Sequence, residues 1–347
     1  MIKVNWSNYF NQASAFSFLR ILFNLHIIEL HLYFKFHFMK IVVIGAGGVG
    51  GYFGGRLALA GNKTTFIVRG QTLDKIHQNG LHVKSIKGDF HVDADATDDY
   101  TVIKEAELIL LCVKSWQIEA IAKKIKPLLQ SYAVLLPLQN GADNANRLSS
   151  ILPPTQIMAG LCRIVSKIES PGVIDHFGYE PEILFGEIDN TQSQRAKTIH
   201  EVFSKAGFKN KISQDIQRDI WLKFLFIASI SAMGALTRSV LGLMREDAFI
   251  RNKLIQTAEE IVSVGKALGI DINESDIKAS FSIIDNIDFD TTMSLQRDMM
   301  EGKPSELENF NGYIVHQGDI LGIDTPVNDF IYYSLRLMEE KVRSVKC

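Results

Sequence analysis

A run of glycines near residue 45 has the residue types and spacing of a phosphate-binding turn. It reads Gly45, Ala46, Gly47, Gly48, Val49 and Gly50. A β-branched apolar run precedes it, and an apolar helical pattern follows it as far as Leu59. In such a turn the first glycine allows the bend, the second lets the backbone approach a pyrophosphate, and the third lets the helix pack on the strand. The helix N-terminus adds free N–H groups, so residues 45–50 are predicted to bind a dinucleotide.

The residue that closes the next strand decides which dinucleotide is preferred. An NAD-selective site tends to place Asp or Glu there to hold the ribose 2′-hydroxyl. This chain has Arg69 instead, between Val68 and Gly70. Because a guanidinium can hold a 2′-phosphate with its fork of donors, we expect NADPH as the cofactor.

Buried strands must position this turn. The main predicted strands are Lys40–Ile44, Thr64–Val68, Leu108–Val113 and Ala133–Leu138. Shorter strands that extend or edge the same sheet are expected at Leu81–Val83, Phe90–Val92, Ile157–Val165, Val173–Phe177 and Ile183–Gly186. Helical patterns separate the main strands, as in residues 116–129. This alternation predicts an α/β fold with a Rossmann-type parallel sheet that is covered on both faces.

From residue 215 the pattern changes to long helices with few strand signals. The expected helices span 215–236, 246–268, 273–286, 305–321 and 325–345. Residues 39–210 are therefore predicted to form the NADP-binding Rossmann domain, and residues 211–347 an all-helical C-terminal domain.

Four further segments carry polar residues in these predicted elements. Two follow the strands at 108–113 and 133–138, at the end of a parallel sheet where ligands bind. The segments read Val113-Lys114-Ser115-Trp116-Gln117, Pro137-Leu138-Gln139-Asn140-Gly141, Trp221-Leu222-Lys223 and Ser305-Glu306-Leu307-Glu308-Asn309-Phe310-Asn311-Gly312. Together with the glycine turn and Arg69, they resemble ketopantoate reductase (2-dehydropantoate 2-reductase) from Met39 to about Arg343.

The resemblance implies an enzyme that reduces ketopantoate to D-pantoate with NADPH, on the route to pantothenate and coenzyme A. It also implies a role for five residues, most of them in a helical domain that binds substrate and carries catalytic groups. By this resemblance Lys223 is the lysine that donates the proton and polarises the carbonyl, and Glu306 is the glutamate that contacts the substrate hydroxyl. Asn140 is the asparagine that touches nicotinamide and substrate. Lys114 is the lysine that lies by the cofactor, and Ser294 is the serine that binds the substrate carboxylate.

These residue types suit the implied reaction. Hydride addition to a ketone carbon leaves an oxyanion, which needs a cationic donor that can also deliver a proton, as Lys223 can. A carboxylate such as Glu306 nearby would hold the ammonium and accept a hydrogen bond from the substrate hydroxyl. Oriented donors such as Asn140 and Ser294 would fix the keto acid against the nicotinamide. Glu306 has a rival role as the first-turn charge of a helix that Ser305 caps.

Three positions depart from the best-known form of the family, in which asparagines face the substrate. Ile227 and Ser231 stand one and two turns beyond Lys223, and Leu241 stands just before Gly242. Because residues at i, i+4 and i+8 share one helix face, Lys223, Ile227 and Ser231 are expected to line the substrate cleft. The pocket has thus exchanged amides for aliphatic surface, which discriminates weakly between substrates.

Two alternatives therefore stay open. One is a related D-2-hydroxyacid dehydrogenase that reduces other branched or aromatic 2-keto acids. The other is a catalytically inactive nucleotide-binding protein, and the joint presence of Lys223, Asn140 and Glu306 argues against it.

The composition of the chain excludes several other classes of protein. Hydrophobic residues make up 46% and charged residues 22%, close to ordinary globular usage, so neither a disordered chain nor a fibre is expected. The net charge of -2 gives no strong attraction to nucleic acid or to an acidic membrane. Cys112, Cys162 and Cys347 are too scattered for a disulfide framework or a metal site, which fits a cytoplasmic protein. We expect a small 2-keto acid as the partner, and a monomer or a homodimer.

The first 38 residues differ from the rest, since ten of the 33 aromatic residues fall within them. Arg20, Glu29 and Lys35 interrupt their apolar stretch, and a charge near a bilayer centre costs about 2.5 to 3.5 kcal/mol. A membrane span is therefore not expected, and no small-residue cleavage site supports a signal peptide. We predict an N-terminal extension, or translation from an upstream start, that is not part of the fold.

Overall fold

The computed structural model describes residues 38–345. The chain divides into two units, Met1–Met39 and Lys40–Cys347, and the elements below belong to the second. The predicted extension of residues 1–38 lies outside the described residues except for Phe38. The predicted domain limits, 39–210 and 211–347, stay a prediction.

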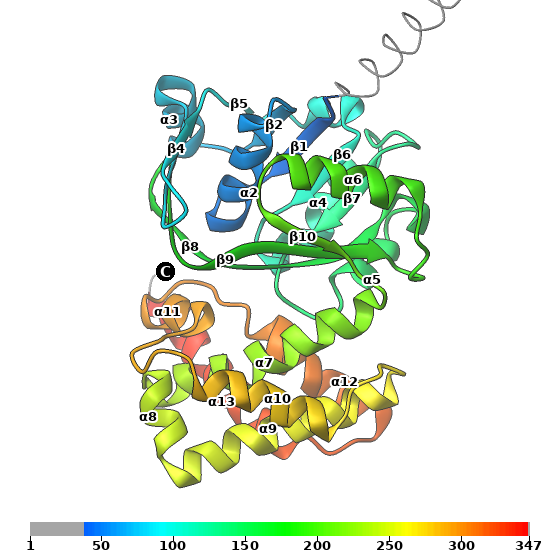
Figure 1. The fold of residues 1–347 in the computed structure, drawn as a ribbon. Helices are drawn as coiled ribbons and strands as arrows, with labels where there is room; N and C mark the ends of the chain where they lie inside the picture. The colour runs from blue at the N-terminus through cyan, green and yellow to red at the C-terminus, as the bar shows by residue number, and fades with distance from the viewer. Residues whose placement is uncertain (1–37, 346–347) are drawn as a thin grey trace, which may run out of the picture. The chain divides into compact units, whose positions relative to one another are not determined.

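A five-stranded parallel sheet carries the glycine turn (Figure 1). In order across the sheet its strands are β5 (Asp95–Thr97), β2 (Lys63–Ile67), β1 (Lys40–Ile44), β6 (Leu108–Leu111) and β7 (Val134–Pro137). Ile44 at the end of β1 is in register with Ile67 of β2 and with Leu111 of β6. The strands therefore end together, and the turn after β1 lies beside the segments that follow β2 and β6. The predicted Rossmann-type sheet is confirmed, with β5 as an additional edge strand.

Helices cover both faces of this sheet because the strands are apolar on both sides. Val42 and Ile44 pack in one cluster with the apolar face of α4 (Ile118–Ile125). On the other face α2 (Gly48–Leu59) comes so close that a Cβ added at Gly54 would lie 2.9 Å from the Val43 side chain. The remaining helices and 3₁₀ turns of this part are α3 (Gln71–Asn79), η1 (Tyr100–Glu105), η2 (Ser115–Gln117), α5 (Asn144–Ser149), η3 (Pro154–Gln156) and α6 (Gln194–Lys205).

The shorter strands do not extend the first sheet as predicted but form a second one. Its order is β10 (Lys209–Ile212), β9 (Val173–Glu187), β3 (Leu81–Ser85) and β4 (Phe90–Val92), and β8 (Met158–Ser170) pairs antiparallel with β9. Two of the predicted short strands are joined in β9, which runs beside β8 as the long green pair in Figure 1. A single bridge between Leu135 and Ile157 links the start of β8 to the first sheet.

The C-terminal part is helical, as predicted. Its elements are α7 (Ile216–Thr237), α8 (Leu241–Glu246), α9 (Ala248–Ala267), α10 (Glu274–Asp285), α11 (Ser294–Met300), the π-helical turn η4 (Glu308–Gly312), α12 (Tyr313–Leu321) and α13 (Pro326–Val345). The helix predicted over 305–321 is wrong at its start, because Ser305 and Glu306 precede the π-helical turn. Helix α11 was not foreseen.

Helix α7 forms the core of this helical part. The Asp215 side chain accepts a hydrogen bond from Arg218 N and so caps its start, and Trp221, Phe224 and Leu225 pack in a cluster with residues of α9 to α13. Among the described residues it is the one helix long and apolar enough to cross a membrane, but 72% of that stretch is buried inside the protein. Its apolar character is therefore explained by packing.

Candidate active site

The glycine turn after β1 has open space where a ligand's phosphates would lie. Gly45 has φ of 97°, a conformation that favours glycine, and Gly50 packs so tightly that an added Cβ would lie 1.9 Å from the Gly45 carbonyl oxygen. A Cβ at Gly47, in contrast, would meet no atom within 4 Å. The three glycines therefore have the geometry that the sequence predicted for turn, approach and helix packing.

The start of α2 is electrostatically suited to an anion. Gly47 is the N-cap, so no side chain occupies the free N–H groups, and the first turn, which begins with Gly48 and Val49, has no acidic residue. Ala46 is buried beneath the turn. Ser166 of β8 packs against the first turn, since a Cβ added at Gly48 would lie 2.7 Å from its carbonyl oxygen, and the turn is open at Gly47. The N–H groups and the positive dipole at this opening fit a pyrophosphate, so the described residues fit the dinucleotide that the sequence predicts.

Arg69 lies two residues beyond the end of β2, at the same end of the sheet. Its side chain is exposed, and its charge reaches the Tyr100 hydroxyl at the start of η1, where it opposes the rise in pKa that burial causes. The guanidinium is therefore free to meet a group bound over the β2 end. Its predicted contact with a 2′-phosphate stays a prediction.

Lys114, predicted to lie by the cofactor, pairs with a residue of the helical part, and its predicted role stays a prediction. Its ammonium lies 2.7 Å from an Asp298 carboxylate oxygen on α11 and 5.8 Å from the centre of the Trp116 ring. The Lys114 side chain remains 43% exposed, so it can exchange this partner for another anion.

We predict that Asp298→Asn strengthens NADPH binding about two- to fivefold, because removing the competing carboxylate frees Lys114 and exposed pairs contribute about 0.2 to 1 kcal/mol. Fluorescence titration of NADPH measures the dissociation constant. Asp285→Asn, which removes the carboxylate that pairs with Arg251, is the matched control. A dissociation constant that stays the same or rises in Asp298→Asn contradicts a cofactor role for Lys114.

Lys223 on α7 reaches across to the residues that follow β7 and lie on β8. Its Nζ donates to Asn140 Oδ1 and to the backbone carbonyl of Cys162, each at 2.6 Å. Burial lowers the pKa of the Lys223 ammonium from its ordinary 10.5; the Cys162 thiol and Glu306 oppose this shift, and Arg163 adds to it. The structure therefore brings Lys223 and Asn140 together, and the ammonium is held by two acceptors. Its predicted role as proton donor stays a prediction.

This lowered pKa predicts the pH dependence of a reduction that draws its proton from Lys223. The ammonium is lost as the pH rises through its pKa, so kcat for reduction should fall along an alkaline limb whose midpoint lies below 10.5. The reverse oxidation needs the neutral amine and should rise over the same interval. Initial rates in both directions measure the midpoints, and a reduction rate that stays flat up to pH 10.5 would contradict the role.

Glu306 is 6% exposed and faces the segment after β6 rather than bonding to Lys223. Its Oε1 accepts a hydrogen bond from Ser115 N at 3.3 Å, and Ser115 Oγ donates to Asn309 Oδ1 at 2.7 Å. Among the described residues the Lys223 ammonium meets Asn140 and Cys162, and the Glu306 charge acts on it only through space. Glu306 therefore favours the ammonium by its charge, without a hydrogen bond to it, and its predicted contact with a substrate hydroxyl stays a prediction. The rival role as a first-turn helix charge is wrong, because Glu306 precedes the π-helical turn, which begins at Glu308.

Ile227 and Ser231 are both buried on α7, one and two turns beyond Lys223. Ile227 belongs to the apolar cluster of the helical part, and the Ser231 hydroxyl donates to the Ile227 carbonyl. Leu241 is fully buried in the same cluster, and Ser294 is the first residue of α11. The contacts of these four residues with a substrate stay a prediction.

Several contacts at the site were not foreseen. Ser115 and Asn309 stand inside segments that the sequence singled out, but their partnership joins residues far apart in the chain. Cys162 contributes its backbone carbonyl, while burial raises the pKa of its thiol. Neither Asp298 nor Arg163 carries a local signal that marks it.

Family models match most of the chain. Residues 41–190 match the model described as ketopantoate reductase PanE/ApbA, and residues 215–339 match the model of the C-terminal part of the same family. An uncharacterized oxidoreductase of Bacillus subtilis, YkpB, is 28% identical over 306 residues, which cover 87% of this chain and 99% of that protein.

Solved structures with the same fold include two of interest here. A PanE/ApbA family ketopantoate reductase from Ralstonia eutropha has a TM-score of 0.82 and 29% identity, and the match covers 88% of this chain and 100% of that one. A D-mandelate dehydrogenase with NADH and anilino(oxo)acetate has a TM-score of 0.81 over the same shares of the two chains, but at 20% identity this likeness shows the fold alone.

Proposed function

The chain belongs to the ketopantoate reductase PanE/ApbA family, and we propose that it reduces 2-dehydropantoate (ketopantoate) to D-pantoate with NADPH. Membership makes it an oxidoreductase that uses a nicotinamide dinucleotide. The observation that carries the proposal is the partly buried Lys223 side chain, whose ammonium is held at 2.6 Å by both Asn140 Oδ1 and the Cys162 carbonyl. A desolvated ammonium with two fixed acceptors and one remaining N–H is suited to meet a carbonyl oxygen.

The chain's own residues would handle the proton and the charge. A bound NADPH supplies the hydride that forms the new C–H bond. Lys223 stabilises the oxygen as the carbonyl π-electrons move onto it, then gives that oxygen its proton and recovers one from solvent. Asn140 keeps the ammonium aimed, and Glu306 would accept a hydrogen bond from the product hydroxyl.

The substrate's other groups would be held by residues of α7 and α11. Ser294 would donate to the substrate carboxylate, while Ile227 would contact its branched carbon chain. Arg69 would hold the cofactor's 2′-phosphate and Lys114 would lie by the cofactor, which fits the exposure of the two side chains.

A related D-2-hydroxyacid dehydrogenase is the second candidate, and the presence of Ile227 and Ser231 in place of the family's asparagines favours it. An aliphatic wall accepts branched or aromatic groups that lack the hydroxyl of ketopantoate, and a site that has lost amide groups discriminates weakly against them. The D-mandelate dehydrogenase fold shows that this scaffold carries such an enzyme elsewhere.

Steady-state assays with NADPH and three keto acids separate the candidates. The proposal expects kcat/KM for ketopantoate to exceed the values for 2-ketoisovalerate and benzoylformate by at least about tenfold. Ketopantoate turned over no better than the other two would favour the dehydrogenase. No turnover of any of them, with NADPH still bound, would favour the inactive nucleotide-binding protein.

The proposed setting is the cytoplasm, as a monomer or homodimer that has no metal and no nucleic-acid or membrane partner. Cys112 and Cys162, the two cysteines in the described residues, are free thiols, which supports a reducing compartment.

A further inference from the structure

The loop that carries Asn140 is held from behind by a second asparagine. Asn144 begins α5, and its side chain turns back so that Nδ2 donates to the carbonyl of Gln139 at 3.0 Å and to that of Asn140 at 3.3 Å. Gly141 between them has φ of 128°, and a Cβ added there would lie 3.4 Å from the Asn144 amide. The loop therefore wraps around this one side chain.

The orientation of the Asn144 amide is fixed by what it faces. Its side chain is buried, and turning the amide over would set its oxygen against two carbonyl oxygens. The oxygen Oδ1 is buried and has no hydrogen-bond partner among the described residues. The Asn144 amide thus leaves its buried oxygen without a hydrogen bond while its nitrogen donates twice to one loop. This arrangement indicates that the amide serves to hold the loop.

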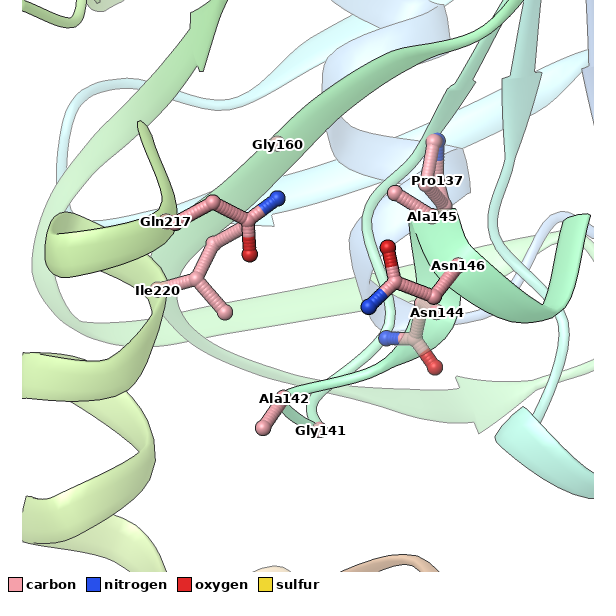
Figure 2. Close-up of a pocket in the computed structure, with 9 residues that line it drawn as sticks. All are labelled: Pro137, Gly141, Ala142, Asn144, Ala145, Asn146, Gly160, Gln217 and Ile220. Carbon is pink, nitrogen blue, oxygen red and sulfur yellow. The ribbon is translucent and has the colours of Figure 1, made fainter. Parts of the chain in front are cut away.

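Asn144 also lines a small chamber between this loop and the start of α7. Figure 2 shows the side chains of Asn144, Asn146 and Gln217 around it, and its volume of about 10 Å³ has room for one water at most. Gly160 on β8 belongs to the same wall, where an added Cβ would lie 2.6 Å from the Leu136 side chain. The loop thus has tight packing behind it, and the Asn144 amide supports its backbone from that side.

We propose that Asn144 is a positioning residue that sets the place of Asn140 and, through it, of the Lys223 ammonium. The path is short: Asn144 fixes the Asn140 carbonyl, and Asn140 Oδ1 lies 2.6 Å from Lys223 Nζ. The catalytic consequence rests on the proposed function, while the effect on Lys223 itself does not.

The first test measures the Lys223 ammonium without substrate or cofactor. In protein labelled with [6-¹³C]lysine, NMR titration gives the pKa of Lys223, whose signal is assigned by its absence in Lys223→Met. The charged groups that act on it are the Cys162 thiol and Arg163 of β8 and Glu306. Since Asn140 Oδ1 accepts from the charged form, Asn144→Ala should loosen that bond and lower the pKa of Lys223 further.

Asn146→Ala is the matched control. It removes the same type of side chain from the same helix and the same chamber, and Asn146 has no described side-chain bond to the Asn140 loop. In the Asn146→Ala variant, the pKa of Lys223 should equal that in the parent protein.

The second test measures catalysis. Asn144→Ala should lower kcat about 10- to 100-fold through misplacement of the proton donor, and the dissociation constant for NADPH should stay within about twofold of the parent value. In an Asn140→Ala background the same substitution should have little further effect, because the group through which it acts is gone. Asn144→Ser, which keeps one short donor, should fall between parent and alanine variant.

Two results would overturn the inference. The first is an Asn144→Ala variant whose Lys223 pKa and kcat equal those of the parent although its melting temperature is lower. The second is a loss of kcat on Asn144→Ala that is equally large in the parent and in the Asn140→Ala background. If Asn144→Ala fails to fold, Asn144→Ser is judged on the same measurements. A parent protein that reduces no keto acid would refute the proposed function, and the NMR titration would still decide the role of Asn144.

Discussion

Lys223→Met is expected to lower kcat about 10³-fold while NADPH binding stays unchanged. The loss follows from two roles in one group, because the ammonium that stabilises the developing oxyanion also delivers the proton. Methionine fills a similar volume, so the residues that pack around Lys223 should keep their places. Single-turnover measurement of NADPH oxidation reports the reductive step, and fluorescence titration reports cofactor binding.

The effect on stability separates this result from simple unfolding. A buried ammonium is costly to desolvate, and an apolar residue of similar size removes that cost together with the bonds to Asn140 and Cys162. The melting temperature should therefore change little or rise. Lys266→Met, which removes an exposed lysine paired with Glu274 on the helical part, is the control and should leave both kcat and stability near the parent values. If Lys223→Met retained more than about a tenth of kcat, Lys223 would not be the proton donor.

The part of the fold that the sequence predicted correctly is the part set by local patterns. β1, the glycine turn and α2 follow one another within twenty residues. Each is marked by its own residue types: a β-branched apolar run, closely spaced glycines and an apolar helical pattern. The three-residue strand β5 has Ala96 as its only apolar residue, so alternation does not mark it. It forms because it pairs with β2 at the sheet edge.

The second sheet could not be predicted from local sequence patterns. Periodicity predicts a strand but not its partner, and β3 pairs in parallel with β9, about ninety residues later in the chain. The two strands predicted at 173–177 and 183–186 are one, since Tyr179, with φ of 63°, bends β9 without ending it. Tyr179 and Glu180 are exposed, so the apolar pattern is interrupted there while the strand continues.

The same limit applies to the site. The 3.6-residue period placed Ile227 and Ser231 on the face of Lys223, but it does not say that the Ser231 hydroxyl bonds to the Ile227 carbonyl, a use common for serine in helices. The bonds of Ser115 to Glu306 and Asn309 join positions more than 190 residues apart. Residue type indicated the chemistry, and only the folded chain determines which groups touch.

Arg69→Ala is expected to raise the KM for NADPH about 10- to 100-fold and to leave the KM for NADH within about twofold. A guanidinium bonded to a phosphate contributes about 1.5 to 3 kcal/mol, and NADH has no 2′-phosphate to lose that contact. The exposed position of Arg69, two residues beyond the end of β2, supports the expectation, because burial and packing change little when the side chain is removed. Steady-state kinetics with each cofactor give the ratio of KM values.

Lys63→Ala provides a matched control for charge. Lys63 is an exposed cation at the opposite end of the same strand, so its removal changes the net charge equally without touching the predicted phosphate position. Both KM values should stay near the parent's. Arg69→Glu should go further and favour NADH over NADPH, because a carboxylate repels the 2′-phosphate and accepts a hydrogen bond from the 2′-hydroxyl. A parent that uses the two cofactors equally well, or an alanine variant that loses both alike, would show that Arg69 does not select the cofactor.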